Sequence, residues 1–244
     1  MAIYGGFAAV YDALMDPPYD EWAQYVSALW AKFGEKPKLA LDIACGTGNM
    51  TARFAAQGYD MIGVDSAADM LAAARAKNSE ILYICQDMRE LELYGTVDAA
   101  ACLCDGMNYL ESYDDLVQVM RLMRNYLNPG GVFVFDMNTE HYFADILGDS
   151  TFAEAGETVA YIWENSYDCE SRVNEYAVTF FTEDENGLYK RFEEVHRETA
   201  FAESDVRKAA AKSGLTVCAV YDELTFDGPQ DTSERIFYIL RREQ

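Results

Sequence analysis

Basic residues are scarce in this chain of 244 residues. It has 19 Lys and Arg against 42 Asp and Glu, which gives a formal net charge of −23 at pH 7. Proteins that bind nucleic acid need basic side chains to neutralise phosphates, and anionic membranes attract basic segments in the same way. The charge balance therefore predicts neither nucleic acid nor a membrane as a partner.

Cysteine pairs, clustered histidines and long apolar runs are missing as well. The six cysteines include no C-x-x-C pair, and the two histidines, His141 and His196, are far apart. This spacing indicates no metal site and a reducing compartment. No run approaches the roughly 18 apolar residues of a membrane span, and residues 1–10 lack the pattern of a secretory signal. We therefore expect a globular, cytoplasmic protein with one large domain or one domain with an insertion.

Strand-like and helix-like segments alternate between residues 38 and 138. Helix-like stretches separate the apolar runs, and Gly58 follows the first of these helices where a C-terminal glycine belongs. The alternation predicts right-handed β-α-β units and a mostly parallel sheet. The predicted strands are Leu39–Ile43, Tyr59–Val64, Ile81–Cys85, Val97–Cys104 and Val132–Met137, and the helices between them are Asn49–Gln57, Ala67–Lys77 and Tyr113–Leu127.

The pattern changes after residue 150. Three long segments, Thr158–Tyr167, Arg172–Thr182 and Leu188–Phe201, are rich in aromatic and β-branched residues, and Asn186-Gly187 is a hairpin signal. These features predict an antiparallel β-meander inserted after the fifth strand. The predicted organisation is a helical N-terminal segment (1–37), an α/β domain (38–148 and 202–244) and an inserted sheet (149–201). The α/β domain is completed by a helix at Glu203–Lys212 and strands at Leu215–Tyr221 and Arg235–Arg241.

Each predicted parallel strand brings an acidic residue close to its carboxyl end. In open α/β sheets, ligands bind outside the carboxyl ends of the strands. Exposure at strand ends explains one or two polar residues, whereas five in register beside a glycine loop indicate a binding site. The five residues are Asp42, Asp65, Asp87, Asp105 and Asp136.

The loop after the first strand carries Gly46 and Gly48. Glycine permits backbone conformations that a β-carbon forbids and lets a ligand lie against bare backbone. Asp65, about 20 residues further on, suits the G-x-G-x-x-G fingerprint of dinucleotide-binding proteins. However, Thr51 stands at the third glycine position, and Asp42 would repel a pyrophosphate. The pattern favours a cationic, phosphate-free ligand, with a nicotinamide-dependent oxidoreductase as the alternative.

Four stretches of the chain carry a family resemblance: Asp42–Gly48, Val64–Leu71, Gln86–Met88 and Leu127–Gly131. In this order they resemble the motifs of the class I, Rossmann-like, S-adenosylmethionine-dependent methyltransferases. The resemblance covers about residues 38–138 and the last two strands, and Ala44 departs from the glycine that many members have. It implies an α/β fold with a Rossmann-like, mostly parallel seven-stranded sheet and helices on both faces. It also implies S-adenosylmethionine as the cofactor and a small-molecule methyl acceptor.

The resemblance implies a role for each matching residue. Asp65 is expected to accept hydrogen bonds from both ribose hydroxyls and Asp87 from the adenine amino group. Met70 is expected on the adenine face, with the glycine loop along the methionyl part of the cofactor. The full set of expected cofactor contacts is Tyr11, Asp42, Ala44, Gly46, Gly48, Asp65, Ser66, Met70, Asp87, Met88 and Asp105.

Methyl transfer from a sulfonium is an in-line displacement with a neutral leaving group. Positioning and exclusion of water supply most of the acceleration, so no catalytic motif is required. In the resembling family, acceptors lie where Asp105–Tyr109 stands here, and this segment lacks the Asn-Pro-Pro-aromatic signature of methylation on nucleic-acid bases. Asn108, Tyr109 and His141 are the candidate catalytic residues, and His196 is the other side chain that titrates near neutral pH.

The two flanking segments are expected to close the site. In the resembling family the N-terminal segment folds over the cofactor, which makes Tyr4 and Tyr11 candidate lid residues. The inserted sheet has aromatic residues that favour a cationic or planar acceptor; it covers the acceptor or pairs with a second subunit, so both a monomer and a homodimer remain open. A further hypothesis is a non-catalytic protein that binds S-adenosylmethionine.

Overall fold

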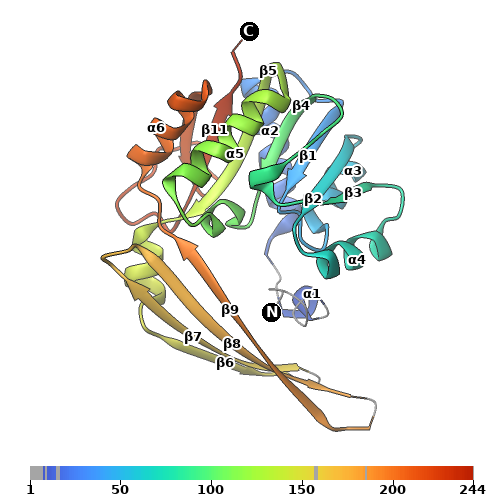
Figure 1. The fold of residues 1–244 in the computed structure, drawn as a ribbon, viewed down its shortest axis with the longest axis vertical. Helices are drawn as coiled ribbons and strands as arrows, with labels where there is room; N and C mark the ends of the chain where they lie inside the picture. Colours follow the sequence, from blue (N-terminus) through green and yellow to red (C-terminus); the bar gives the residue numbers. More distant parts are fainter. Residues whose placement is uncertain (1–7, 9, 15–16, 157–158, 185, 244) are drawn as a thin grey trace.

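Two β-sheets form the framework of the protein (Figure 1). In the larger sheet, of seven strands in the order β10-β11-β5-β4-β1-β2-β3, β11 runs antiparallel to both of its neighbours, and the other pairs are parallel. The predicted Rossmann-like fold is therefore confirmed. Its strands are β1 (Leu39–Ile43), β2 (Asp60–Asp65), β3 (Leu82–Cys85), β4 (Val97–Cys102), β5 (Leu127–Asn138), β10 (Thr216–Asp222) and β11 (Arg235–Arg241). The computed structural model describes residues 8, 10–14, 17–156, 159–184 and 186–243.

Helices cover both faces of the larger sheet because its strands are apolar on both sides. Adjacent strand residues point to opposite faces, so Leu41 packs in one apolar cluster with residues of α5 and α6, while Ala40 packs in a second cluster with residues of α2 and α3. This two-sided burial is what continuous apolar runs predict. The helices are α2 (Tyr19–Phe33), α3 (Asn49–Ala56), α4 (Ala68–Lys77), α5 (Tyr113–Tyr126) and α6 (Glu203–Ser213).

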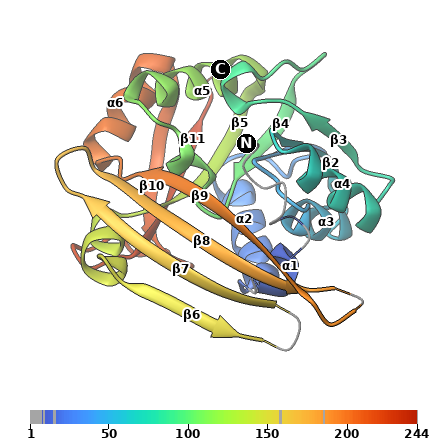
Figure 2. The same cartoon turned by 60° about the horizontal axis from the view of Figure 1, so that its bottom comes forward.

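The smaller sheet is the antiparallel meander that follows β5. Its strands are β6 (Thr151–Ala155), β7 (Val159–Asp168), β8 (Val173–Glu183) and β9 (Tyr189–Thr199), each paired with the next (Figure 2). The sequence predicted β7, β8 and β9. It did not predict β6, because all five residues of that edge strand are exposed and no alternation of apolar and polar residues marks it.

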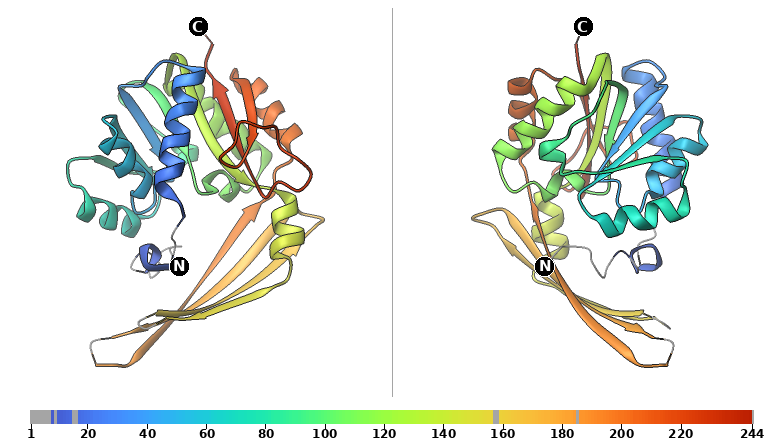
Figure 3. Two further views of the ribbon diagram at one scale, coloured as in Figure 1. Left: turned by 180° about the vertical axis from the view of Figure 1, so that it is seen from behind. Right: turned by 45° about the vertical axis from the view of Figure 1, so that its right-hand side comes forward.

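The smaller sheet lies across from the carboxyl ends of the parallel strands, and the short helix α1 (Tyr11–Leu14) lies between the two sheets (Figures 1 and 3). The 3₁₀ turn η3 (Gly106–Tyr109) joins them. The side-chain amide of Asn108 donates to the carbonyl oxygens of Asn138, at 3.1 Å, and Thr199, at 3.0 Å. The end of β5 and the end of β9 are thereby held together.

No helix in the described part of the chain combines the length and apolarity of a membrane span.

Among the parallel strands, two boundaries differ from the prediction by more than one residue. The β4 strand ends at Cys102, because Cys104 and Asp105 adopt left-handed backbone conformations with φ of 58° and 56°. The β5 strand begins at Leu127 rather than at Val132, since the Gly130 N–H donates to the Arg242 carbonyl at 2.8 Å and continues the pairing. The sequence Pro129-Gly130-Gly131 is typical of a turn, but here the backbone of Arg242 supplies hydrogen-bond partners that keep this segment in the strand.

Trp30 anchors α2 on the larger sheet and offers a test of this packing. Its side chain is fully buried, its ring centroid lies 4.8 Å from that of Phe54 and 5.5 Å from that of Tyr59, and its indole N–H donates to the Ala100 carbonyl. Trp30→Ala should lower the free energy of unfolding by about 3–5 kcal/mol in urea denaturation. Substitution of the exposed Tyr94 by Ala should change it by less than about 0.5 kcal/mol; equal effects would contradict this packing.

Candidate active site

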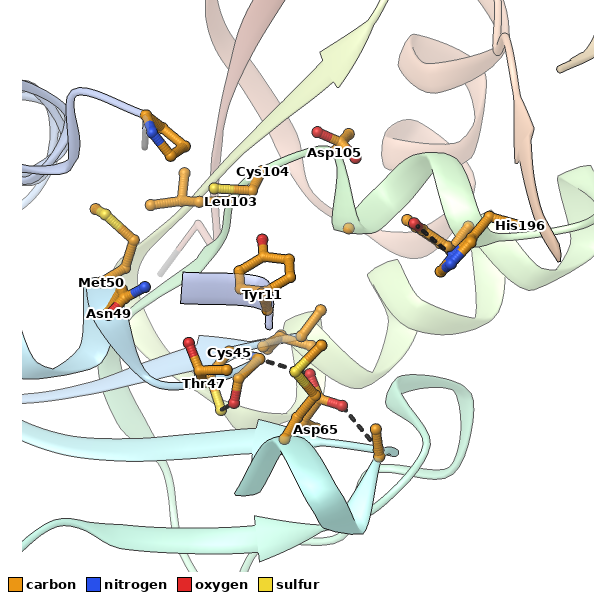
Figure 4. A pocket seen from close by; sticks show the side chains of 18 of the residues that line it. Tyr11, Cys45, Thr47, Asn49, Met50, Asp65, Leu103, Cys104, Asp105 and His196 are labelled. Atoms are coloured by element: carbon orange, nitrogen blue, oxygen red, sulfur yellow. Dashed lines mark hydrogen bonds between the residues drawn. The ribbon is translucent and has the colours of Figure 1, made fainter. Parts of the chain in front are cut away.

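A cavity of about 970 Å³ lies between the carboxyl ends of β1, β2 and β4 and the inward face of the smaller sheet. Figure 4 shows the Tyr11 ring from α1 in the middle of the view, with Asp65 on one side and Cys104 on the other. His196, from β9, lies at the end opposite Met50. The cavity therefore runs from the glycine loop to the smaller sheet, and both sheets contribute to its wall.

The glycine loop follows β1 in a tight, left-handed path. Ala44, Gly46 and Gly48 have positive φ angles of 54°, 53° and 77°. A β-carbon at Gly48 would lie 2.6 Å from the hydroxyl of Tyr83, whereas one at Gly46 would meet no heavy atom within 4 Å. Gly48 is thus required by packing and conformation, while the backbone at Gly46 is open to the cavity.

Asp65 ties this loop to the end of β2. One carboxylate oxygen accepts from the Gly46 N–H and the other from the Ala67 N–H, both at 2.8 Å. Burial raises the pKa of Asp65 above its ordinary value. Each carboxylate oxygen accepts more than one hydrogen bond, so Asp65 retains acceptor capacity toward the cavity that it lines.

Asp42 lies beneath the loop and is only 1% exposed. It accepts from the hydroxyl of Thr51 at 2.5 Å. Burial raises the pKa of Asp42 to about 7, and the nearby carboxylate of Asp65 adds to the rise. Thr51, which replaces the third glycine of the dinucleotide fingerprint, therefore positions this buried carboxyl group.

The remaining three carboxylates of the predicted row lie at this edge but are paired with arginine. Asp87 receives the Arg89 guanidinium at 2.6 Å, and this hydrogen bond lowers the pKa of Asp87. Arg235 donates to Asp105 at 3.0 Å and also to Asp136. Burial raises the pKa of Asp136 to about 6. The sequence prediction missed Arg235, because it stands in β11, far along the chain from both of its partners.

Ser66, Met70, Met88 and Tyr11, which were also predicted as cofactor contacts, line the cavity, whereas Gly48 is not among the described lining residues. The other predicted lid residue, Tyr4, lies outside the described residues.

Asp12, which was not among the predicted site residues, holds α1 against the glycine loop. It accepts from the hydroxyl of Thr47 at 2.6 Å and from the amide of Asn49 at 2.9 Å, and it pairs with Lys77 at 2.6 Å. These hydrogen bonds lower the pKa of Asp12, against the opposing effect of its burial. Nothing in the local sequence marks this residue, since its partners follow more than 30 positions later.

The three candidate catalytic residues lie in different surroundings. Tyr109 lines the cavity, and its hydroxyl lies 2.7 Å from that of Tyr176 and 3.2 Å from Nδ1 of His196. Asn108 is fully buried and holds β5 and β9, and it is not among the described lining residues. His141 also lies outside that lining, and its ring pairs with Asp145 at 2.8 Å. Of the three candidates, Tyr109 alone is among the described lining residues, and its side-chain partners there include His196.

A buried carboxyl group stands behind this pair. The carboxyl group of Glu198 accepts from the Tyr176 hydroxyl at 2.8 Å and from the side-chain amide of Asn138 at 3.4 Å. Burial, together with the charge of Asp105, raises the pKa of Glu198 to about 8. His196 and Glu198 are two residues apart on β9 and so share one face of the strand. This spacing is the signal in the sequence that would have indicated them together.

Comparison with known proteins identifies the family. A family model described as "Methyltransferase domain" matches residues 40–131. The crystal structure of an S-adenosylmethionine-dependent methyltransferase from Clostridium acetobutylicum ATCC 824 superimposes with a TM-score of 0.87 at 29% identity and covers 99% of both chains. The Bacillus subtilis (strain 168) protein "Putative methyltransferase YqeM" is 34% identical over 242 residues, 97% of this chain and 96% of its own. This chain belongs to the class I S-adenosylmethionine-dependent methyltransferases.

A second relative of this methyltransferase is named for its substrate. The dTDP-4-amino-2,3,4,6-tetradeoxy-D-glucose N,N-dimethyltransferase of Saccharopolyspora spinosa is 28% identical over 216 residues, 85% of this chain and 84% of its own. The predictions of an enzyme and of S-adenosylmethionine as its cofactor are confirmed by these relatives. They do not support the nicotinamide-dependent alternative.

The raised pKa of Asp42 predicts a pH-dependent stability. Between about pH 4, the ordinary pKa of an aspartate, and pH 7, Asp42 ionises in the unfolded chain but stays protonated in the folded protein. The free energy of unfolding should therefore fall with rising pH, by up to roughly 1.4 kcal/mol per pH unit, relative to Asp42→Asn. Urea denaturation of both proteins from pH 4.5 to 7.5 measures this difference. The exposed Asp60→Asn should follow the wild type; parallel curves for Asp42→Asn and the wild type would refute the assignment.

The contacts of Asp12 predict a kinetic effect at the cofactor end. Asp12→Ala removes the acceptor for Thr47 and Asn49 and the ion pair with Lys77, so α1 loses its attachment to the glycine loop. Stopped-flow measurement should show that S-adenosylhomocysteine dissociates about tenfold faster, which corresponds to about 1.4 kcal/mol. Asp20→Ala, which removes the surface ion pair between α2 and Arg53 of α3, is the matched control. An unchanged dissociation rate would show that α1 does not retain the ligand.

Proposed function

We propose that this methyltransferase transfers the methyl group of S-adenosylmethionine to a nitrogen or oxygen nucleophile of a small molecule bound between η3 and the smaller sheet. The observation that carries the proposal is the continuous cavity of about 970 Å³ with the glycine loop at one end and aromatic side chains at the other. Small-molecule pockets span roughly 300–1,000 Å³, so this volume accommodates a donor and an acceptor together. The amino-sugar substrate named for the Saccharopolyspora spinosa relative supports a small-molecule acceptor.

The residues at the loop end fit S-adenosylmethionine. The open backbone at Gly46 accommodates the methionyl part, with Asp42 as an acidic group beneath it. Asp65 accepts from the ribose hydroxyls, since its carboxylate is fixed by two N–H groups and still has acceptor capacity. Met70 packs on the adenine, and Asp87 accepts from the adenine amino group while Arg89 holds its carboxylate.

The remaining cofactor contacts are assigned with different roles. The backbone of Ala44 and Gly48 shapes the loop, and Ser66 and Met88 border the nucleoside part. Asp105 borders the sulfonium, with its charge balanced by Arg235. Tyr11 closes the cavity from α1.

The chemistry asks mainly for positioning. When bound, S-adenosylmethionine supplies a methyl group on a sulfonium, and the leaving group departs as a neutral thioether. The chain holds the nucleophile in line with that methyl group and excludes water. Tyr109 lines the cavity, and its hydroxyl lies within hydrogen-bond distance of Tyr176 and His196, so we assign it the contact with the acceptor.

The smaller sheet provides the cover of the acceptor end in this proposal. Trp163 and Tyr176 from its inward face line the cavity, and the segment 149–201 acts as an insertion in the domain formed by 38–148 and 202–244. Within the predicted lid segment 1–37, α1 acts as the lid, whereas α2 packs on the larger sheet. Nothing in the proposed chemistry needs a second subunit, and a monomer and a homodimer are both compatible with it.

Binding of the cofactor product tests the proposal. S-adenosylhomocysteine should raise the melting temperature of the protein, and NAD should not. Asp65→Asn should weaken S-adenosylhomocysteine binding about a hundredfold in calorimetry, because two charge-assisted hydrogen bonds to the ribose become weaker. Asp60→Asn, on the exposed start of β2, should bind as the wild type does. Stabilisation by NAD, or an unchanged affinity in a folded Asp65→Asn protein, would refute the assigned site.

A further inference from the structure

Carboxylates outnumber basic groups along the cavity. Among the described residues that line it, the basic side chains are Arg89, Arg235 and His196. The residues outside the described ranges contain no lysine or arginine. Eight acidic side chains line the same cavity: Asp42, Asp65, Asp69, Asp87, Asp105, Glu111, Glu223 and Glu234.

Both arginines are already engaged by carboxylates. Arg89 donates to both oxygens of Asp87, from Nη2 to Oδ2 at 2.6 Å and from Nε to Oδ1 at 3.0 Å. Arg235 donates to Asp105 and Asp136, and its Nε lies 3.8 Å from Glu223. Proteins hold a phosphate or diphosphate with guanidinium, ammonium or clustered N–H donors. Such a group in this cavity would have to break existing ion pairs while it faced further carboxylates.

The acceptor end has the features that attract a cation. Tyr161, Trp163, Tyr176 and Phe180 line it from the inward face of β7 and β8. The rings of Trp163 and Tyr176 lie 5.0 Å apart, which makes a continuous aromatic wall. Ammonium groups bind the faces of such rings, and a cation in this position is also attracted by the carboxylates of the lining.

A chain of hydrogen bonds connects the cavity to a group that can accept a proton from an ammonium ion. Tyr109 lines the cavity, its hydroxyl lies 2.7 Å from that of Tyr176, and Tyr176 lies 2.8 Å from a carboxylate oxygen of Glu198. Because the pKa of Glu198 is raised to about 8, the carboxylate is the minor form at pH 7, and this form is basic enough to take the proton.

The proton steps balance along this chain. An N–H proton of the acceptor passes to the Tyr109 oxygen, the Tyr109 proton passes to Tyr176, and the Tyr176 proton passes to the Glu198 carboxylate. The nitrogen lone pair then forms the new N–C bond to the methyl group, and the electron pair of the broken C–S bond stays on sulfur. Glu198 acts through the two tyrosines and has no contact with the acceptor.

We propose that the acceptor is an amine without phosphate groups, bound as an ammonium ion against the aromatic wall and deprotonated through Tyr109. This inference rests on the proposed function and narrows it. It separates this chain from the Saccharopolyspora spinosa relative, which is named for a dTDP-linked amino sugar.

Calorimetric titration of the complex with S-adenosylhomocysteine tests the inference. The probes are three amines with their hydroxyl counterparts: ethanolamine with ethylene glycol, benzylamine with benzyl alcohol, and glucosamine with glucose. At least one amine should bind about tenfold or more tightly than its counterpart, and dTDP at millimolar concentration should not bind. No preference in any pair, or binding of dTDP, would overturn the inference.

Variants locate the preference in the cavity. The double variant Glu223→Gln/Glu234→Gln should weaken binding of the preferred amine about fivefold to tenfold, whereas the exposed Glu35→Gln should not. An equal affinity in the double variant and the wild type would overturn the placement. The affinity for S-adenosylhomocysteine, measured in the same samples, separates the two proposals. Its absence would overturn the proposed function, and its presence without amine binding would overturn the acceptor class alone.

Discussion

The hydrogen bond from the Gly46 N–H to the Asp65 carboxylate sets the geometry on which the site depends. It fixes the left-handed loop after β1 to the end of β2, and the Cys45 N–H bond to the Val64 carbonyl, at 3.0 Å, extends the same attachment. In the larger sheet, the strand order reverses between β1 and β4: β2 and β3 follow on one side of β1, and β4 and β5 follow on the other. Ligands of open α/β sheets bind at such a switch point. One short contact therefore places an open stretch of backbone at the position that the topology leaves accessible.

Burial of acidic groups runs through the whole site. Asp42, Asp136 and Glu198 are nearly inaccessible, and burial raises the pKa of each. Such groups cost stability unless hydrogen bonds or opposite charges compensate, and here Thr51 and Arg235 supply part of that compensation. Asp42 lines the cavity, while Asp136 and Glu198 contact Arg235 and Tyr176 of its lining, so the protein concentrates this cost beside the site.

Local pattern decided which features the sequence could predict. The parallel strands follow from apolar runs, and the row of acidic residues follows from their positions at the strand ends, so Asp42 and Asp65 were found. Long-range pairings leave no local signal: Arg235 stands 99 residues from Asp136, and Tyr176 stands 67 residues from Tyr109. His141 was chosen because it follows β5 closely, but η4 (Tyr142–Leu147) begins there and its ring pairs with Asp145 outside the cavity lining.

The amide of Asn108 has a consequence for how such enzymes diversify. It binds the carbonyl oxygens of Asn138 and Thr199, which are the points where the chain leaves the larger sheet and returns to it. The four strands between these points thus form a cassette clamped at a single side chain. Under the proposed function, substitutions on the inward face of that cassette would alter what is methylated and leave the clamp and the donor loop intact. Selectivity for the methyl acceptor could then change through substitutions within one contiguous segment of the chain.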